Sequence, residues 1–185
     1  MRNLDLARAL LDRGADANAR DAVGHTGLHC ATRWGEHDLM QLLLLHGADP
    51  SPVDRHSETP LMVAAYRRDT DGMRLLHERG ADADRQDPAW GTTALLIARE
   101  GVDLPSVQLL LSYRPTLRLR DAHGQSALTI TSDPRILRLL HEAQQRSRRP
   151  GPAVGGAERA ARSRRVRQSR PRASDRKTDR RVGEG

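Results

Sequence analysis

The sequence contains few aromatic residues: two tryptophans, two tyrosines and no phenylalanine in 185 residues. RNA-recognition sheets and single-strand-binding barrels stack bases on several aromatic side chains, so this composition excludes both classes of nucleic-acid-binding domain. The chain also has one cysteine, Cys30. A single cysteine excludes an intrachain disulfide and a zinc site built from cysteines.

Long apolar segments are missing as well. The longest uninterrupted apolar run, 61–66, has six residues, whereas a membrane-spanning helix needs about 20. Acidic residues at positions 5, 12 and 16 interrupt the N-terminal region, where a secretory signal would need a continuous apolar stretch. We therefore expect a cytoplasmic protein without a membrane span, or a nuclear one if the organism is eukaryotic.

The positive charge is concentrated at one end of the sequence. The formal net charge is +7, yet residues 1–145 carry 17 Lys+Arg and 20 Asp+Glu, a net of −3, whereas residues 146–185 carry 14 and 4, a net of +10. Three valines are the only large aliphatic residues of the second segment. It cannot bury enough apolar surface to offset the entropy of ordering. We predict a folded domain over 1–145 and a disordered, Arg-rich tail over 146–185.

A 33-residue repeat organises the first segment. The tripeptide Gly-Ala-Asp begins at positions 14, 47 and 80, and a leucine-rich stretch precedes each copy. An Asp-rich turn follows each copy, and then comes Thr or Ser with Leu two positions later: Thr26-Gly27-Leu28-His29, Thr59-Pro60-Leu61-Met62, Thr93-Ala94-Leu95-Leu96 and Ser126-Ala127-Leu128-Thr129. Several features kept in phase over three to four periods indicate a repeat architecture.

This pattern resembles the ankyrin repeat family over roughly residues 3–145. The resemblance implies an all-α solenoid of stacked helix pairs with protruding β-turn fingers. We expect a partial repeat at 1–20, repeats at 21–53, 54–86 and 87–120, and a trimmed C-terminal repeat at 121–145. First helices are predicted near 26–34, 59–67, 93–100 and, shortened, 126–131, and second helices near 4–13, 36–46, 71–79, 104–113 and 134–145.

Each recurrent residue type has a physical role at a helix end. A Thr or Ser hydroxyl can accept a hydrogen bond from a free backbone N–H at the start of a helix, and Pro60 suits the first helical position. The glycines of the Gly-Ala-Asp copies suit the left-handed residue that ends the second helix. Arg114-Pro115 stands where the next Gly-Ala is expected, which predicts an irregular exit from that helix.

The sequence opens on a second helix, without the first helix of its repeat. Leu4, Leu6, Leu10 and Leu11 would then lack an upstream neighbour, although the end of a solenoid normally carries a polar cap. We predict either that Met1 is an internal or mis-assigned start, or that a partner covers this edge.

The eight histidines and the single cysteine form no catalytic or metal-binding pattern. No two histidines have the His-Glu-x-x-His spacing of a zinc site, and no base is placed to activate Cys30. His29 occupies the position at which the family uses a structural, hydrogen-bonding histidine. We expect a non-enzymatic protein without catalytic, cofactor-binding or metal-binding residues.

The resemblance also implies a binding face, because ankyrin domains usually contact partners through the finger tips and the exposed, concave side of the first helices. Three of the four aromatic residues fall at such positions, among arginines, and Trp, Tyr and Arg are the residues most enriched at interface hot spots. The alternative is that these aromatics pack at helix junctions or beneath the third finger. The predicted protein-binding residues are Val23, His25, Arg33, Trp34, Arg55, His56, Tyr66, Arg67, Trp90 and Glu100.

The Arg-rich tail offers a second function, because arginines can neutralise phosphates and release counterions. The predicted polyanion-binding residues are Arg148, Arg149, Arg164, Arg165 and Arg167. Arg outnumbers Lys 30 to 1 in the whole chain, however, so the arginine content also indicates a coding bias.

Three functions are therefore consistent with the sequence. The leading interpretation is a scaffold that binds an unidentified partner protein. One alternative is a polyanion-binding or nucleic-acid-associated regulator that acts through the tail. The other is an inhibitor of a partner enzyme, because small ankyrin inhibitors of cyclin-dependent kinases are similar in size.

Overall fold

The computed structural model describes residues 2–129 and 131–148. No helix in this part of the chain is long and apolar enough to cross a membrane. Isolated β-bridges join Arg20 to Thr26 and Arg120 to Ser126. The helices of the described part are α1 (Arg2–Asp12), α2 (Gly27–Trp34), α3 (His37–Leu45), α4 (Pro60–Arg67), α5 (Thr70–Glu78), α6 (Ala94–Glu100), α7 (Leu104–Ser112) and α8 (Pro134–Arg148).

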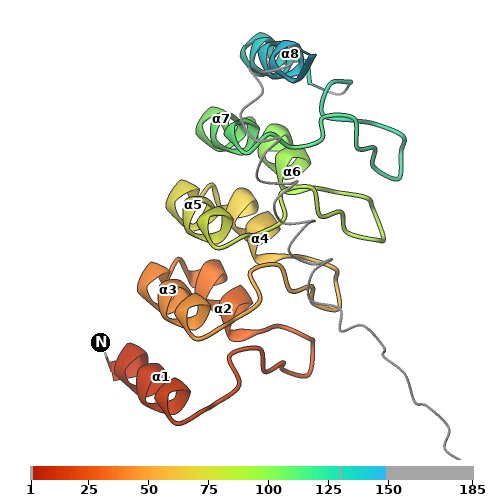
Figure 1. The fold of residues 1–185 in the computed structure, drawn as a ribbon. Helices are drawn as coiled ribbons and strands as arrows, with labels where there is room; N and C mark the ends of the chain where they lie inside the picture. The colour runs from red at the N-terminus through yellow and green to blue at the C-terminus, as the bar shows by residue number, and fades with distance from the viewer. Residues whose placement is uncertain (1, 130, 149–185) are drawn as a thin grey trace, which may run out of the picture. The chain divides into compact units, whose positions relative to one another are not determined.

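The helices pair and stack in two rows (Figure 1). The first helices of the repeats, α2, α4 and α6, contact one another in sequence, and the second helices α1, α3, α5 and α7 do the same. The loop before each first helix projects to the same side of the stack as a finger (Figure 1). The all-α repeat stack expected from the sequence is therefore confirmed.

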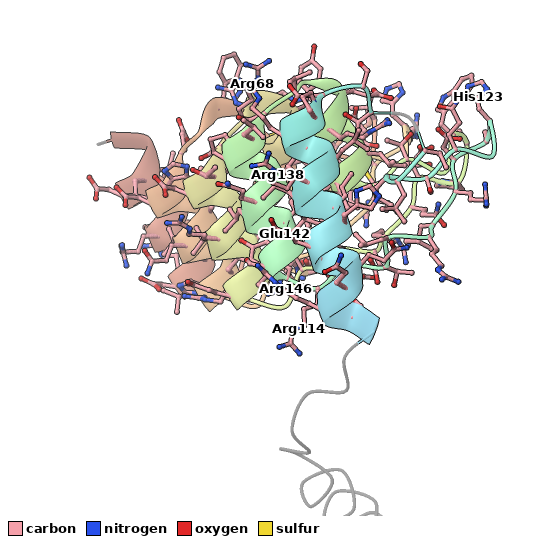
Figure 2. The ribbon with its side chains drawn as sticks, turned by 90° about the horizontal axis from the view of Figure 1, so that it is seen from above. Arg68, Arg114, His123, Arg138, Glu142 and Arg146 are labelled. Atoms are coloured by element: carbon pink, nitrogen blue, oxygen red, sulfur yellow. The ribbon has the colours of Figure 1, made fainter. Side chains whose placement is uncertain are left out.

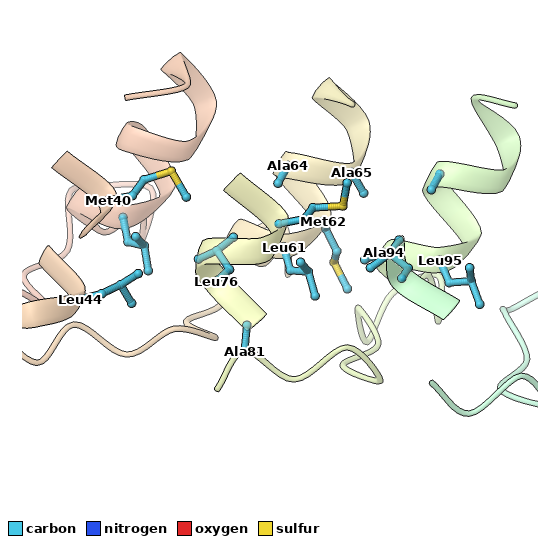
Figure 3. Close-up of a cluster of buried hydrophobic side chains, with 14 of the residues drawn as sticks. Met40, Leu44, Leu61, Met62, Ala64, Ala65, Leu76, Ala81, Ala94 and Leu95 are labelled. Carbon is cyan, nitrogen blue, oxygen red and sulfur yellow. The ribbon is translucent and has the colours of Figure 1, made fainter. Parts of the chain in front are cut away.

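Leucine, alanine and methionine form the interior. Leu28, Leu61 and Leu95 occupy the same repeat position and are 0%, 2% and 3% exposed. The alanines three residues later are at most 1% exposed, and their small side chains let neighbouring helices approach closely. Figure 3 shows these side chains continuing from one repeat to the next. Because aliphatic side chains fill this core, it needs no aromatic side chain, and aromatic residues can lie at the surface.

The helix ends follow the local signals in the sequence. The hydroxyl oxygens of Thr59 and Thr93 accept hydrogen bonds from backbone N–H groups in the first turns of α4 and α6, at 3.2 and 3.3 Å. Gly14, Gly47 and Gly80 have φ values of 88°, 83° and 91°, which is the left-handed conformation expected there. Arg114 takes this conformation without glycine, at φ 57°, so the predicted irregular exit is present.

The predicted short helix at 126–131 is wrong. Residues 127–129 form a turn, and 131–133 have no helical structure. The hydroxyl oxygen of Thr129 accepts from the N–H of Ser126 at 2.8 Å and donates to its carbonyl oxygen at 3.1 Å, which closes the turn on itself. Pro134 then disfavours a helical conformation at Asp133. Between these two constraints there is no room for two helical turns.

The two ends of the described stack differ in polarity. At the N-terminal end Leu6 and Leu10 are 60% and 51% exposed, whereas Leu11 is buried and Leu4 packs partly against the core formed with the following repeats. At the other end α8 buries two aliphatic side chains and carries Arg138, Glu142 and Arg146 outside (Figure 2).

The predicted boundary at residue 145 falls within α8, which ends at Arg148. The predicted tail from 149 onward, and with it the polyanion-binding prediction for Arg149, Arg164, Arg165 and Arg167, lies outside the described residues. The side chain of Arg148 lies outside them as well.

Candidate protein interface

Four fingers project from the stack: finger 1 (20–26), finger 2 (53–59), finger 3 (86–93) and finger 4 (120–126). Each is built around an aspartate whose backbone N–H donates to a carbonyl oxygen four or five residues later. The carboxylate of each aspartate accepts backbone N–H groups of its own finger at 2.8–3.1 Å. These bonds satisfy the donors of the tip, so the fingers hold their shape without a sheet. The aspartates are Asp21, Asp54, Asp87 and Asp121.

Three aromatic side chains are exposed on the first-helix and finger side. Trp34 ends α2, Tyr66 lies in the last turn of α4, and Trp90 belongs to finger 3. Their exposed fractions are 74%, 81% and 62%. They are therefore not packed into helix junctions or beneath the third finger, which was the alternative to a binding role.

The fourth aromatic residue belongs to the second-helix row. Tyr113 stacks on His77 with ring centroids 3.6 Å apart. Burial raises the pKa of the Tyr113 hydroxyl to about 12. Its partial burial and its stacking partner give it a packing role in the repeat stack.

Two adjoining hollows lie on the finger face, which we define as the surface of fingers 1–3 and helices α2, α4 and α6. The smaller hollow, of about 300 Å³, is lined by Arg33, Glu58, Val63, Tyr66 and Arg67. The larger one, of about 480 Å³, is lined by His25, Arg33, His56, Glu58, Met62, Asp87, Trp90, Thr92 and Ile97. Arg33 and Glu58 line both hollows, and their Nη2 and Oε2 atoms are 3.8 Å apart.

The structure places six of the ten predicted binding residues in these hollows: His25, Arg33, His56, Tyr66, Arg67 and Trp90. Trp34 lies outside them at the end of α2, and Glu100 ends α6 beside the guanidinium of Arg99, at 3.4 Å. Val23 and Arg55 also lie outside the hollows, and they join two finger tips.

Sequence reasoning missed the apolar lining of the hollows, Met62, Val63 and Ile97. Their spacing alone does not separate the two faces of so short a helix. Met62 stands one period after His29, and this departure from the repeat was the signal available.

Two histidines connect finger 1 and α2 to finger 2 in different ways. His29 is fully buried, its Nδ1 accepts the N–H of Thr26 at 3.1 Å, and its Nε2 bonds to the carbonyl oxygen of Glu58 at 3.1 Å. Burial lowers the pKa of the His29 imidazole, which favours the neutral ring that these bonds require. The ring of His25 lies between the carboxylates of Asp21 and Asp54, at 3.3 and 3.2 Å.

Within the described ranges, no three side chains of the types His, Cys, Asp and Glu come together in a way that could hold a metal ion. A family model described as ankyrin repeats in three copies matches residues 1–87 and, again, 61–147. None of the curated proteins matches the chain. Ankyrin repeats are in general protein–protein interaction modules and are typically non-enzymatic.

Proposed function

We propose that this chain, which belongs to the ankyrin repeat family, is a non-enzymatic scaffold that captures a partner protein through its finger face. The observation that carries the proposal is the exposure of Trp34, Tyr66 and Trp90 on that face, between 62% and 81%. Large aromatic side chains that are exposed on one face commonly mark an interaction surface. A partner that covers them removes their apolar area from water, which favours binding.

The neighbours of these aromatics strengthen the proposal. Arg33 precedes Trp34 in α2, and Arg67 follows Tyr66 in α4. Both arginines line the smaller hollow, where Val63 adds apolar surface. A partner side chain that enters this hollow would meet apolar area and paired charges together, which is the usual composition of an interface centre and its rim.

Quantitative affinity capture tests this proposal. A partner captured by the full chain is identified and purified, and its dissociation constant is measured for the wild type and for the Trp34→Ala/Trp90→Ala double variant. Truncation of a hot-spot residue costs about 2 kcal/mol, which corresponds to roughly 30-fold weaker binding. The matched control is Leu45→Ala, because Leu45 is 65% exposed but lies on α3 in the second-helix row.

The melting temperature separates binding from folding. We expect the double variant to melt close to the wild type, because these side chains are mostly exposed. Unchanged affinity in the double variant would overturn the proposal. A large fall in its melting temperature would show instead that the two tryptophans stabilise the stack.

A further inference from the structure

Neighbouring finger tips are joined by hydrogen bonds that recur with the repeat. A backbone N–H of one finger donates to a carbonyl oxygen of the finger before it. A side chain at the start of one finger donates to a carbonyl oxygen at the start of the next, and a histidine in the first helix donates to the end of the next finger. Between fingers 1 and 2 these bonds are Arg55 N–H to Val23 O at 3.1 Å, Arg20 Nη1 to Val53 O at 2.6 Å and His29 Nε2 to Glu58 O at 3.1 Å.

Fingers 3 and 4 keep two of these three links. The N–H of Ala122 donates to the carbonyl oxygen of Trp90 at 2.8 Å. The side-chain amide of Gln86 donates to the carbonyl oxygen of Arg120 at 2.9 Å. The pattern therefore belongs to the repeat and is not a peculiarity of the first two fingers.

Fingers 2 and 3 have none of the three links, for a reason visible in the residues. One period after Arg55, Arg20 and His29 stand Pro88, Val53 and Met62. Proline has no N–H, and the valine and methionine side chains have no hydrogen-bond donor. Among the residues that the structure describes, no hydrogen bond or ion pair joins 53–58 to 86–92. The row of fingers is thus interrupted at this one step.

The interruption leaves acceptors without donors. The carbonyl oxygens of His56 and Gln86 correspond to those of Val23 and Val53, which accept bonds between fingers 1 and 2. Within the described ranges, no protein hydrogen bond is made to either His56 O or Gln86 O. Each of the three missing links is missing because its donor is absent. A ligand that fits this step must therefore supply donors.

The larger hollow opens at the same step. Met62 and Ile97 contribute apolar surface to it, and Trp90 contributes an aromatic ring. Two carboxylates line it as well: that of Glu58, which is about half exposed, and that of Asp87, which is buried and accepts three backbone N–H groups of finger 3. Arg33 also lines the hollow, and its Nη2 lies 3.4 Å from His25 Nε2 and 3.8 Å from Glu58 Oε2. With Arg33 counted against Glu58 and Asp87, the formal charge of the lining is −1.

We propose that this step between fingers 2 and 3 is a slot for an arginine side chain of the partner protein; the inference rests on the proposed function, because the slot lies in the finger face. A guanidinium has five N–H donors and no acceptor, which matches acceptors left without donors. The guanidinium would contact the indole of Trp90, whose ring also stacks on His123 at a centroid distance of 6.3 Å. Its methylene stem packs against Met62 and Ile97. Glu58, about half exposed and 3.8 Å from Arg33, supplies an opposite charge that the ligand shares with Arg33. Lysine supplies charge but no planar, forked donor group, so it fits less well.

Peptide titration of the full chain, followed by NMR, tests the slot. The probe is acetyl-Gly-Arg-Gly-amide, and the matched probe carries Lys in place of Arg. We expect saturable shifts of the backbone amides at 54–58 and 89–92 and of the Trp90 indole, with the Lys probe roughly tenfold weaker, as for one strong hydrogen bond.

Variants that restore the missing donors should close the slot. Pro88→Ala returns the N–H that Arg55 and Ala122 have in their fingers, and Val53→Gln returns the side-chain donor that Gln86 has in finger 3. We expect either change to weaken binding of the Arg probe about tenfold, the value of one hydrogen bond to a charged group. Pro50→Ala is the control, because it removes a proline from a turn outside this step.

Each contrary result has a distinct meaning. Equal binding of the Lys probe, or unchanged binding in both closing variants, would overturn the slot. Self-association of the chain that the Arg probe reverses would overturn the assignment to a partner protein, because the occupant would then be an arginine of a second copy. If the probe does not bind while Trp34→Ala still weakens partner capture, the slot fails and the proposed function stands.

Discussion

The backbone N–H of Arg55 donates to the carbonyl oxygen of Val23 at 3.1 Å, and this bond holds the tips of fingers 1 and 2 together. Pro88 occupies the same register in the next finger and has no N–H. The contrast between Arg55 and Pro88 shows how a single residue type decides whether this bond between neighbouring finger tips forms, while the other two links depend on Arg20 and His29.

Arg55→Pro should remove one of the three links between fingers 1 and 2. The substitution removes the bond to Val23, and we expect the free energy of unfolding to fall by about 1 kcal/mol, the net value of one hydrogen bond. Finger 3 carries Pro88 at this register, in a turn one residue longer. Arg55→Ala keeps the N–H and is the control in urea denaturation. Equal stability of the two variants would show that the bond contributes nothing.

His29 should make the fold sensitive to mild acid. Burial holds the pKa of its imidazole below the ordinary 6.5 in the folded state, so between these two pKa values the unfolded chain binds more protons. The free energy of unfolding therefore falls as the pH drops below about 6.5. We expect His29→Gln to be less stable than the wild type at pH 7.5 and to lose less stability between pH 7.5 and pH 5.

Denaturation curves at the two pH values measure this effect. His56→Gln is the control, because His56 is exposed in finger 2 and lacks the two buried bonds of His29. An equal loss of stability on acidification in the wild type and in His29→Gln would contradict the prediction.

Val102→Gly should stabilise the protein. Val102 has φ 51° and is 48% exposed, whereas Gly35 holds the corresponding place after α2 at φ 69°. A left-handed conformation costs a residue with a Cβ roughly 1–2 kcal/mol, and glycine relieves this cost. The greater entropy of glycine in the unfolded chain offsets part of the stability gained. We expect a net gain of about 1 kcal/mol in urea denaturation. Val23→Gly is the control, since Val23 does not have a positive φ, and it should be destabilising.

Arg99→Met should also stabilise the stack. Arg99 is 3% exposed, and smaller residues, Thr32 and Ala65, occupy its position in the earlier repeats. A longer side chain fits at Arg99 because the described residues of the next repeat form no first helix that would pack against it. Burial lowers the pKa of its guanidinium, and its nearest carboxylate, Glu100, is 70% exposed and 3.4 Å away. Replacing a poorly compensated buried charge by an apolar side chain of similar length commonly raises stability by 1 kcal/mol or more.

Thermal denaturation of Arg99→Met and Arg99→Ala separates the effect of charge from that of volume. The alanine variant should be less stable than the methionine variant, because it leaves a cavity where the long side chain packed. A lower melting temperature in Arg99→Met than in the wild type would show that the contact with Glu100 outweighs the burial of the charge.

Local signals in the sequence determined most of the fold. Thr59 and Thr93 begin helices, Pro60 stands at a first helical position, and Gly47 ends one. Each effect depends on a residue and its near neighbours along the chain. The 33-residue period then placed the helix pairs, because identical units bury their apolar faces only against one another. The resemblance to the ankyrin repeat family implied the exposed positions of Trp34 and Tyr66.

Tertiary structure decided what depends on contacts between repeats. The absence of helix at 127–129 and 131–133 follows from a turn that Thr129 closes, and Leu11 is buried by packing across the stack. The open step between fingers 2 and 3 depends on which donor of one finger meets which acceptor of the next. Pro88 and Val53 were visible in the sequence, but only the neighbouring fingers show which bonds these residues cannot make, because the partner atoms lie a whole repeat away.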